Sequence, residues 1–236
     1  VESLNVIAGY PELTSLDLRR NVNLENKDLE IVAAMPKLET LRIYYNSFGN
    51  AGMNKLAKST SLKVVDVRAC QGVSDNSAKY LARIPTLEEV QFRFLITNSG
   101  VEMLTAAQNL KFVEFQDCND LNAGCVEFLK QFPNLTGLRM FRNKGLDDAA
   151  VAGLAELKLK RLELRDLNVG NDGLVPLKAM SGLESVEVSE LPSVDTSALN
   201  EVLGAWTTLT SLNVFSMPAT DETAKVIVAA MPNLKS

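Results

Sequence analysis

Residues 135–146 read LTGLRMFRNKGL, and this stretch decides the fold. The apolar residues Leu138 and Met140 are two positions apart, which is the spacing of side chains on one face of a β-strand. Asn143 follows three residues after Met140, and a second apolar anchor, Leu146, comes three residues later. The stretch predicts a short strand with one buried face, followed by a turn.

The same frame recurs along the chain. It opens on a leucine, places apolar residues three and five positions later, and in most copies ends eight positions later on asparagine, cysteine or leucine. Successive opening leucines are 23–26 residues apart, and they are Leu13, Leu38, Leu62, Leu87, Leu110, Leu135, Leu159, Leu183 and Leu209, with Leu234 opening a tenth copy. Such a period predicts one supersecondary unit stacked on itself as a solenoid.

A helical pattern follows each strand frame. It begins after polar residues that can accept the free N–H groups of a first turn, namely Thr97, Asn122, Asp147, Asp195 and Thr220. Five copies then close on Pro-x-Leu, because proline disfavours helix in the residue before it. Pro176 instead falls where the eighth helix should be established, so we expect that helix to start late or to be distorted.

The repeated frame resembles the leucine-rich-repeat family over the whole chain. The long helical half, with its Thr/Ser-Asp/Asn-x-Gly-Leu start, looks most like ribonuclease-inhibitor-type, F-box-associated and large bacterial repeats. The resemblance implies an α/β fold, a right-handed horseshoe solenoid with a parallel concave sheet and convex helices. Curvature also follows from spacing, because paired strands lie about 4.8 Å apart whereas packed helices need roughly 8–10 Å.

We expect a single leucine-rich-repeat domain over residues 1–236, with about nine repeats of 23–26 residues, because a solenoid grows by addition. Leu4, Ile7 and Ala8 look like the helix of an earlier repeat, and neither end shows a polar cap. The chain is therefore interpreted as an internal piece of a longer protein. No run of 18 apolar residues occurs, so we expect no membrane insertion in this segment. The sequence predicts neither compartment nor oligomeric state.

Several kinds of chemistry are missing from the sequence. The net charge of −5 argues against general nucleic-acid binding, which relies on a basic surface. The absence of histidine removes Ser-His-Asp and Cys-His systems and all histidine metal ligands. Asp147 and Asp148 are interpreted as charges that favour a helix N-terminus. We therefore expect no catalytic site, no cofactor and no metal.

The cysteines and the asparagines that end the frame are interpreted as structural. Cys70 and Cys118 lie two repeats apart, roughly 9.6 Å along the sheet, beyond the ~7 Å Cα separation of a disulfide. These two and Cys125 are predicted to be buried thiols, in preference to a redox or metal role. Three residues are predicted to form a ladder to backbone groups, namely Asn21, Asn46 and Asn143. Apolar packing should replace the ladder at Leu95, Leu167, Leu191 and Met217.

Residues between the buried positions of each strand should point to the concave face. The middle column on that face reads Asp17, Arg42, Asp66, Gln91, Glu114, Arg139, Glu163, Glu187 and Asn213. The next column reads Arg19, Tyr44, Arg68, Arg93, Gln116, Phe141, Arg165, Ser189 and Phe215. Nine of the ten arginines lie in or just after strands, whereas most lysines fall on helices and turns. Arginine and aromatic residues are enriched at protein interfaces, so this segregation indicates a recognition surface.

The sequence leaves two roles open for these residues. Arg42 lies between Asp17 and Asp66, and Arg139 lies between Glu114 and Glu163, so the charges could pair across strands. Pairing does not explain the aromatic residues, and we expect both roles to hold. The predicted partner-binding residues are Arg19, Arg42, Tyr44, Arg68, Arg93, Arg139, Phe141, Arg165 and Phe215.

The sequence favours a non-catalytic module that binds a protein or peptide on its concave face. The alternatives are an accessory recognition domain of a larger enzyme and a substrate adaptor. The adaptor is permitted by the resemblance to F-box-associated repeats, although no F-box segment occurs within residues 1–236.

Overall fold

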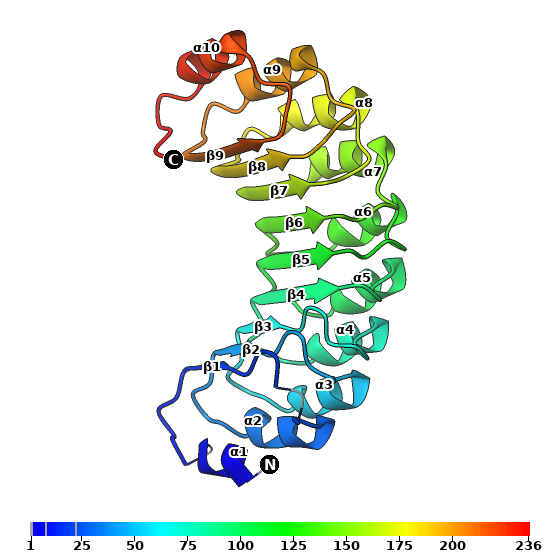
Figure 1. Cartoon of the computed structure of the whole chain (residues 1–236), viewed down its shortest axis with the longest axis vertical. Helices are drawn as coiled ribbons and strands as arrows, with labels where there is room; N and C mark the ends of the chain where they lie inside the picture. The colour runs from blue at the N-terminus through cyan, green and yellow to red at the C-terminus, as the bar shows by residue number, and fades with distance from the viewer. Residues whose placement is uncertain (1, 8, 22) are drawn as a thin grey trace.

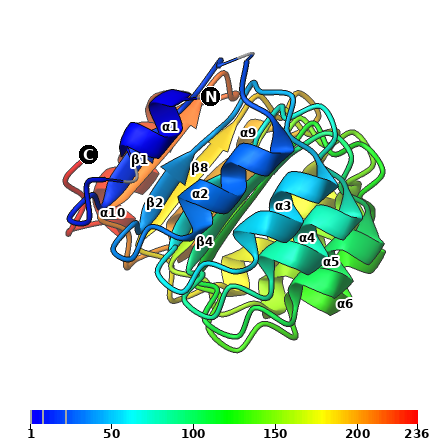
Figure 2. The same ribbon diagram turned by 90° about the horizontal axis from the view of Figure 1, so that it is seen from below.

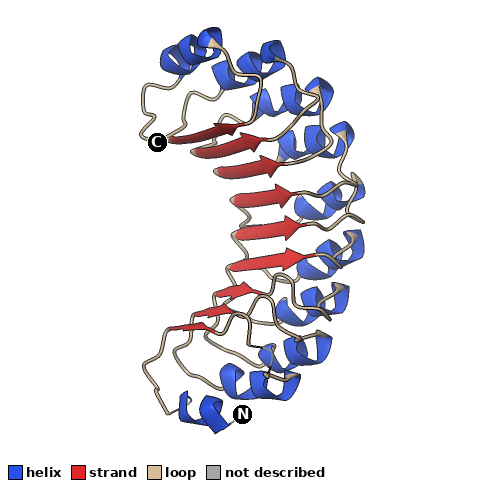
Figure 3. Cartoon of the chain, viewed as in Figure 1, coloured by secondary structure: helices blue, strands red, loops and turns tan. Residues whose placement is uncertain are grey.

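The computed structural model describes residues 2–7, 9–21 and 23–236. Their strands form one parallel nine-stranded sheet, in which the strand order follows the chain order from β1 to β9. The strands lie along the inner side of a curved arc and the helices along its outer side (Figure 1; Figure 3). The predicted leucine-rich-repeat solenoid, with its concave parallel sheet and convex helices, is therefore confirmed.

The strands fall at the positions of the repeated frame. They are β1 (Ser15–Asp17), β2 (Thr40–Arg42), β3 (Val64–Asp66), β4 (Glu89–Arg93), β5 (Phe112–Gln116), β6 (Gly137–Phe141), β7 (Arg161–Arg165), β8 (Ser185–Ser189) and β9 (Ser211–Phe215). Although β1 to β3 are shorter than the others, ladder-type hydrogen bonds continue beyond them, for example from Arg20 N to Tyr44 O at 3.2 Å. Side chains at equivalent frame positions therefore lie side by side along the sheet.

The described helices are short; two of them, α7 and α8, end in 3₁₀ turns, and α2 is preceded by one. The α-helices are α1 (Glu2–Ile7), α2 (Leu29–Ala33), α3 (Asn50–Leu56), α4 (Asp75–Leu81), α5 (Asn98–Leu104), α6 (Gly124–Leu129), α7 (Asp148–Gly153), α8 (Asn171–Leu174), α9 (Thr196–Ala205) and α10 (Asp221–Ala230). The 3₁₀ segments are η1 (Asn26–Asp28), η2 (Leu154–Glu156) and η3 (Val175–Ala179). Leu4 and Ile7 lie in α1 as expected, whereas Ala8 lies outside the described residues.

The apolar positions of the frame fill the space between the sheet and the helices. Helices α2 to α6 lie in a row on one side of the strands (Figure 2). Leu41, Leu138 and Leu162 on the sheet have no exposed surface, and neither does Leu104 on α5. The core is thus continuous from repeat to repeat, as the alternation of apolar and polar residues predicted.

The eighth helix is distorted at Pro176, which is one of the two outcomes expected from the sequence. Helix α8 starts on time at Asn171 and changes after one turn into the 3₁₀ segment η3, with Pro176 as its second residue. The helix is therefore distorted rather than delayed. The reason is that proline lacks the N–H for an α-helical hydrogen bond and its ring crowds the preceding turn.

Two asparagines form the expected ladder. Asn46 donates to Leu18 O at 2.9 Å and to Ile43 O at 2.7 Å, while Asn143 donates to Phe115 O at 2.8 Å. The side chain of Asn21 is exposed. The residue joins the ladder only through its backbone N–H, which donates to Asn46 Oδ1 at 2.6 Å.

The expectation that packing replaces the ladder at Leu95 is wrong. Its side chain is 53% exposed, whereas Leu167 and Leu191 are buried. The backbone turns further at the preceding Phe94, where φ is 81°, than at the equivalent residues of other repeats, where φ is 52–59°. This turn carries Leu95 outward.

A second ladder connects the starts of the helices, and the sequence analysis did not find it. In it, the polar residue at one helix start bonds to the start of the next helix. Asp75 accepts from Thr97 N at 2.9 Å, and Asp148 accepts from Gly170 N at 2.7 Å. The sequence suggested only that such residues cap their own helices. Their hydrogen bonds show that they also hold neighbouring repeats together.

Candidate functional site

The concave face carries columns of side chains that run across the strands. Strand pairing aligns Glu114, Arg139 and Glu163 in the middle column, and Gln116, Phe141 and Arg165 in the next column. The predicted columns are therefore confirmed by the register of the sheet. Asp66, Glu114, Glu163 and Ser189 are buried, and the other residues of the two columns are half-buried or exposed.

A further column lies at the edge of the sheet, one residue beyond the column that contains Gln116, Phe141 and Arg165. Every repeat has a residue with positive φ there, and none is glycine; these are Arg20, Tyr45, Ala69, Phe94, Asp117, Arg142, Asp166, Glu190 and Ser216. Left-handed backbone is uncommon for such residues. We call these residues the edge column. The sequence signal for it is the residue just before the asparagine, cysteine or leucine that ends each frame.

Arginines and tyrosines form one cluster over the first three repeats. The Tyr44 and Tyr45 rings meet edge to face at 5.6 Å between centroids. Arg19 and Arg68 lie 5.0 and 5.4 Å from the Tyr44 ring, and Arg20 lies 5.0 Å from the Tyr45 ring. Arginine over an aromatic face is an attractive cation–π arrangement. We call this group the tyrosine cluster.

Arg93 joins the tyrosine cluster to the fourth repeat. Its Nη1 donates to the Tyr45 hydroxyl at 2.9 Å, and its guanidinium lies 4.4 Å from the Phe94 ring. Ala69, between Tyr45 and Phe94 in the edge column, is too small to cover either ring. Tyr45 and Phe94 remain 46% and 43% exposed.

A second cluster surrounds Phe141. Arg142, Arg165 and Arg139 lie 4.2, 4.9 and 5.9 Å from the centre of its ring. Arg165 also approaches Phe215, at 6.0 Å, and Phe215 is 54% exposed. Aromatic residues that the sequence could not explain by charge pairing are thus in contact with arginines.

Ion pairs run through the middle column. Buried Glu114 lies 3.0 Å from Arg68 Nη1 and 3.6 Å from Arg139 Nη1, and Arg139 also lies 3.0 Å from Glu163. The expected pairing of Arg139 with both neighbouring glutamates is confirmed. Burial raises the pKa of Glu114, and it outweighs the two arginines, which act to lower it.

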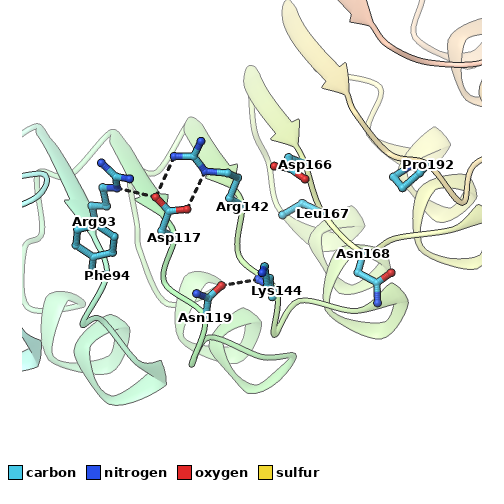
Figure 4. A pocket seen from close by; sticks show the side chains of 10 residues that line it. All are labelled: Arg93, Phe94, Asp117, Asn119, Arg142, Lys144, Asp166, Leu167, Asn168 and Pro192. Carbon is cyan, nitrogen blue, oxygen red and sulfur yellow. Dashed lines mark hydrogen bonds and ion pairs between the residues drawn. The ribbon is translucent and has the colours of Figure 1, made fainter.

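Asp117 holds two arginines at the edge of the sheet. It accepts from Arg93 Nε at 2.6 Å and from Arg142 Nε at 2.8 Å (Figure 4). Burial acts to raise the pKa of Asp117, but the hydrogen bonds from Arg142 and Arg93 outweigh it and hold the pKa below its usual value. An open groove of about 820 Å³ borders this group, with Asp166 and Pro192 on its far side.

Arg42 does not form the pairs expected from the sequence. Asp17 instead accepts from Arg19 Nε at 2.7 Å, and Asp66 accepts from Arg68 Nη2 at 2.8 Å. Each carboxylate is taken by the arginine two residues later in its own repeat. Within the described part of the chain, exposed Arg42 has no ion pair.

The structure places the nine predicted residues on one face but in different surroundings. Tyr44 and Arg68 share the tyrosine cluster with Arg19, while Arg139 and Arg165 surround Phe141. The predicted binding residues do not include Arg20, Tyr45, Phe94 and Arg142. These four belong to the edge column, which lies one residue beyond the frame positions that define the concave face.

The three cysteines are buried inside the repeats. Cys70, Cys118 and Cys125 are buried and free, as predicted, and burial raises the pKa of each thiol to about 12. Among the residues described, no group of three or more acidic or cysteine side chains is placed to hold a metal ion. No helix in the same residues is long and apolar enough to cross a membrane.

The single curved sheet and its outer row of helices define the class of protein, a leucine-rich-repeat solenoid. A chain in the crystal structure of a Rad7 and Elc1 complex in yeast is 18% identical, over 99% of this chain and 65% of that one, with a TM-score of 0.76. A chain in the crystal structure of a TLR13–ssRNA13 complex is 20% identical, over 86% of this chain and 32% of that one, with a TM-score of 0.53.

This chain therefore spans less than two thirds of the length of either similar chain. At these identities the likeness establishes the shared fold. No family model and no curated protein matches the sequence.

Proposed function

We propose that this chain is a non-catalytic protein-interaction module that holds a protein or peptide segment against its concave face. The observation that carries the proposal is the row of exposed aromatic side chains set among arginines there. Tyr45, Phe94 and Phe215 are each 43–54% exposed on the inner side of the arc or at its edge. Arginine and aromatic residues supply much of the binding energy of protein interfaces.

Internal pairing does not account for the whole face. Most of its arginines contact carboxylates, and these pairs stabilise the sheet. The exposed aromatic rings gain little from that pairing, because a ring already in contact with arginine still exposes apolar surface to water. A partner that covered these rings would bury that surface, which is favourable by roughly 25 cal/mol per Å².

The comparisons support recognition of a macromolecule as the use of this fold. Both similar chains come from structures of complexes, one of Rad7 with Elc1 and the other of TLR13 with ssRNA13. A net charge of −5 favours a protein partner over a nucleic acid for this chain. An accessory recognition domain of an enzyme or a substrate adaptor would use the same face.

Selection of peptides from a phage-displayed random library on the immobilised chain tests the proposal. Selected peptides should bind Phe141→Ala or Arg93→Ala more weakly than the parent chain by over about 1 kcal/mol. The matched control is Lys79→Ala on helix α4, which lies on the convex side. Thermal midpoints should show that all three variants fold.

Peptides that tolerate both concave changes but lose binding in Lys79→Ala would overturn the proposed face. Failure to select any peptide that depends on a concave residue would overturn the proposed function.

A further inference from the structure

Charge is divided unevenly along the concave face. The first four strand segments, residues 15–20, 40–45, 64–69 and 89–94, carry five arginines and three carboxylates, a formal charge of +2. The other five, residues 112–117, 137–142, 161–166, 185–190 and 211–216, carry four arginines and six carboxylates, a formal charge of −2. In a chain of net charge −5, the first four repeats therefore present a locally positive surface.

Among the residues that the structure describes, two guanidinium groups on this positive surface lack a carboxylate partner. Exposed Arg42 has none within the described residues, because Asp17 and Asp66 pair with Arg19 and Arg68. The guanidinium of Arg20, also exposed, lies over the ring of Tyr45 and has no ion pair in the part of the chain that the structure describes. An exposed guanidinium can bind a carboxylate through two parallel hydrogen bonds.

The surface next to these arginines is hollowed. One hollow of about 270 Å³ is lined by Arg42, Tyr44 and Arg68, among others, and a second of about 420 Å³ is lined by Arg19, Arg20 and Tyr44. The two hollows share Tyr44. Arg42 pairs with Asp17, three residues before Arg20, so the two arginines are offset by one strand spacing of about 4.8 Å across the sheet and by about 10 Å along it. Residues about three apart in one extended peptide can therefore reach both.

The exposed rings of Tyr45 and Phe94 border the same surface. They offer apolar contact beside positive charge, which suits a peptide that carries hydrophobic residues among acidic ones. Asp17 and Asp66 lie in the floor of the first hollow and would repel a multiply charged phosphate more than a single carboxylate. The surface thus fits a carboxylate-bearing polypeptide.

Resting on the proposed function, we infer that the first four repeats bind an acidic peptide segment, with Arg42 and Arg20 receiving its carboxylates and Tyr45 and Phe94 receiving its apolar side chains. The positive charge on this face would attract an acidic peptide and speed its association, whereas the negative charge on the rest of the chain would repel it.

Peptides selected from the random phage library provide the probes for this inference. They should be enriched in Asp and Glu, and their affinity should fall as salt is raised. Arg42→Gln and Arg20→Gln should each weaken a selected peptide about tenfold. The matched control is Arg83→Gln, because Arg83 follows helix α4 and also stacks on a tyrosine, Tyr80, at 5.2 Å.

A change in the opposite direction separates charge from folding effects. Asp17→Asn removes a carboxylate beside Arg42 and should tighten acidic peptides, whereas damage to the fold would weaken them. Circular dichroism and thermal midpoints of the four variants should match those of the parent chain.

The outcomes distinguish this inference from the proposed function. Selected peptides without acidic enrichment, or equal binding by Arg42→Gln, Arg20→Gln and the parent, would overturn the inference. If such peptides still lose affinity in Phe141→Ala, the proposed function stands. If no selected peptide depends on any concave residue, both are overturned.

Discussion

Gly173 packs directly against the carboxylate of Asp148, and the contact leaves no room for a side chain at residue 173. A Cβ atom there would lie 2.7 Å from Asp148 Oδ1 and 2.8 Å from Asp148 Cα. The same Oδ1 accepts the hydrogen bond from Gly170 that links the start of α7 to the start of α8. A Cβ atom on Gly52 would lie at least as close to Asn26 Oδ1, and one on Gly100 at least as close to Asp75 Oδ1. The ladder between helix starts therefore requires a small residue in the next helix.

We expect Gly173→Ala to lower the free energy of unfolding by about 1–3 kcal/mol, because Asp148 must move and lose its hydrogen bond. This effect opposes the intrinsic preference of alanine for helix. Gly204→Ala in α9 is the control, since the nearest atom to a Cβ there is Val226 Cγ1 at 3.6 Å. That variant should gain about 0.5–1 kcal/mol. Urea unfolding measures both, and equal effects of the two changes would contradict the account.

Truncation of the core leucines should be costly. Leu41→Ala, Leu138→Ala and Leu162→Ala should each lower the free energy of unfolding by about 2–5 kcal/mol, because all three are completely buried. Leu95→Ala is the matched control: its side chain is 53% exposed, so its effect should stay within about 0.5 kcal/mol. Urea denaturation in which Leu95→Ala is as damaging as Leu138→Ala would show that the frame was misplaced.

Half-buried Asp117 and buried Glu114 should change the pH dependence of stability in opposite directions. The pKa of Asp117 is lowered in the folded state, so its contribution is present above its unfolded pKa of about 3.9 and is lost as pH falls through the folded pKa. The pKa of Glu114 is raised, so its charged form costs stability as pH rises from about 4.3 through the folded pKa.

We therefore expect Asp117→Asn to lose less stability than the parent between pH 7 and pH 3, and Glu114→Gln to lose more. Both variants keep the shape of the side chain while removing its titration. The free energy of unfolding in urea at several pH values provides the measurement. Parallel pH profiles for the two variants would show that these carboxylates do not titrate as their surroundings imply.

The three thiols should react slowly in the folded protein. Burial removes access and raises each pKa to about 12, so little thiolate is present near neutral pH. Labelling by a disulfide reagent at pH 8 should become fast only in denaturant. Ser216→Cys, at an exposed edge position, is the positive control and should label at once. Fast labelling of all three native thiols without denaturant would contradict their burial.

Some failures of the sequence analysis have a common physical origin. Arg42 was expected between two aspartates, because residues opposite one another on paired strands are neighbours. A long arginine side chain can also reach a carboxylate two residues away on its own strand, and Arg19 and Arg68 do so. The sequence lists the candidates, but the choice among them depends on side-chain conformation. The edge column was not predicted because it lies one residue beyond the frame positions that define the concave face, and its members share no residue type.

The sequence by itself determined the repeat, the parallel sheet, the buried frame and the face on which arginines and aromatics gather. These follow from spacing alone, because a pattern repeated every 23–26 residues has the same local solution each time. Three features emerge only in three dimensions: Arg42 and Arg20 have no carboxylate partner among the described residues, Leu95 is exposed, and hydrogen bonds link the helix starts of neighbouring repeats. Those outcomes arise where side chains from several repeats compete for the same partner, and position in the chain does not settle that competition.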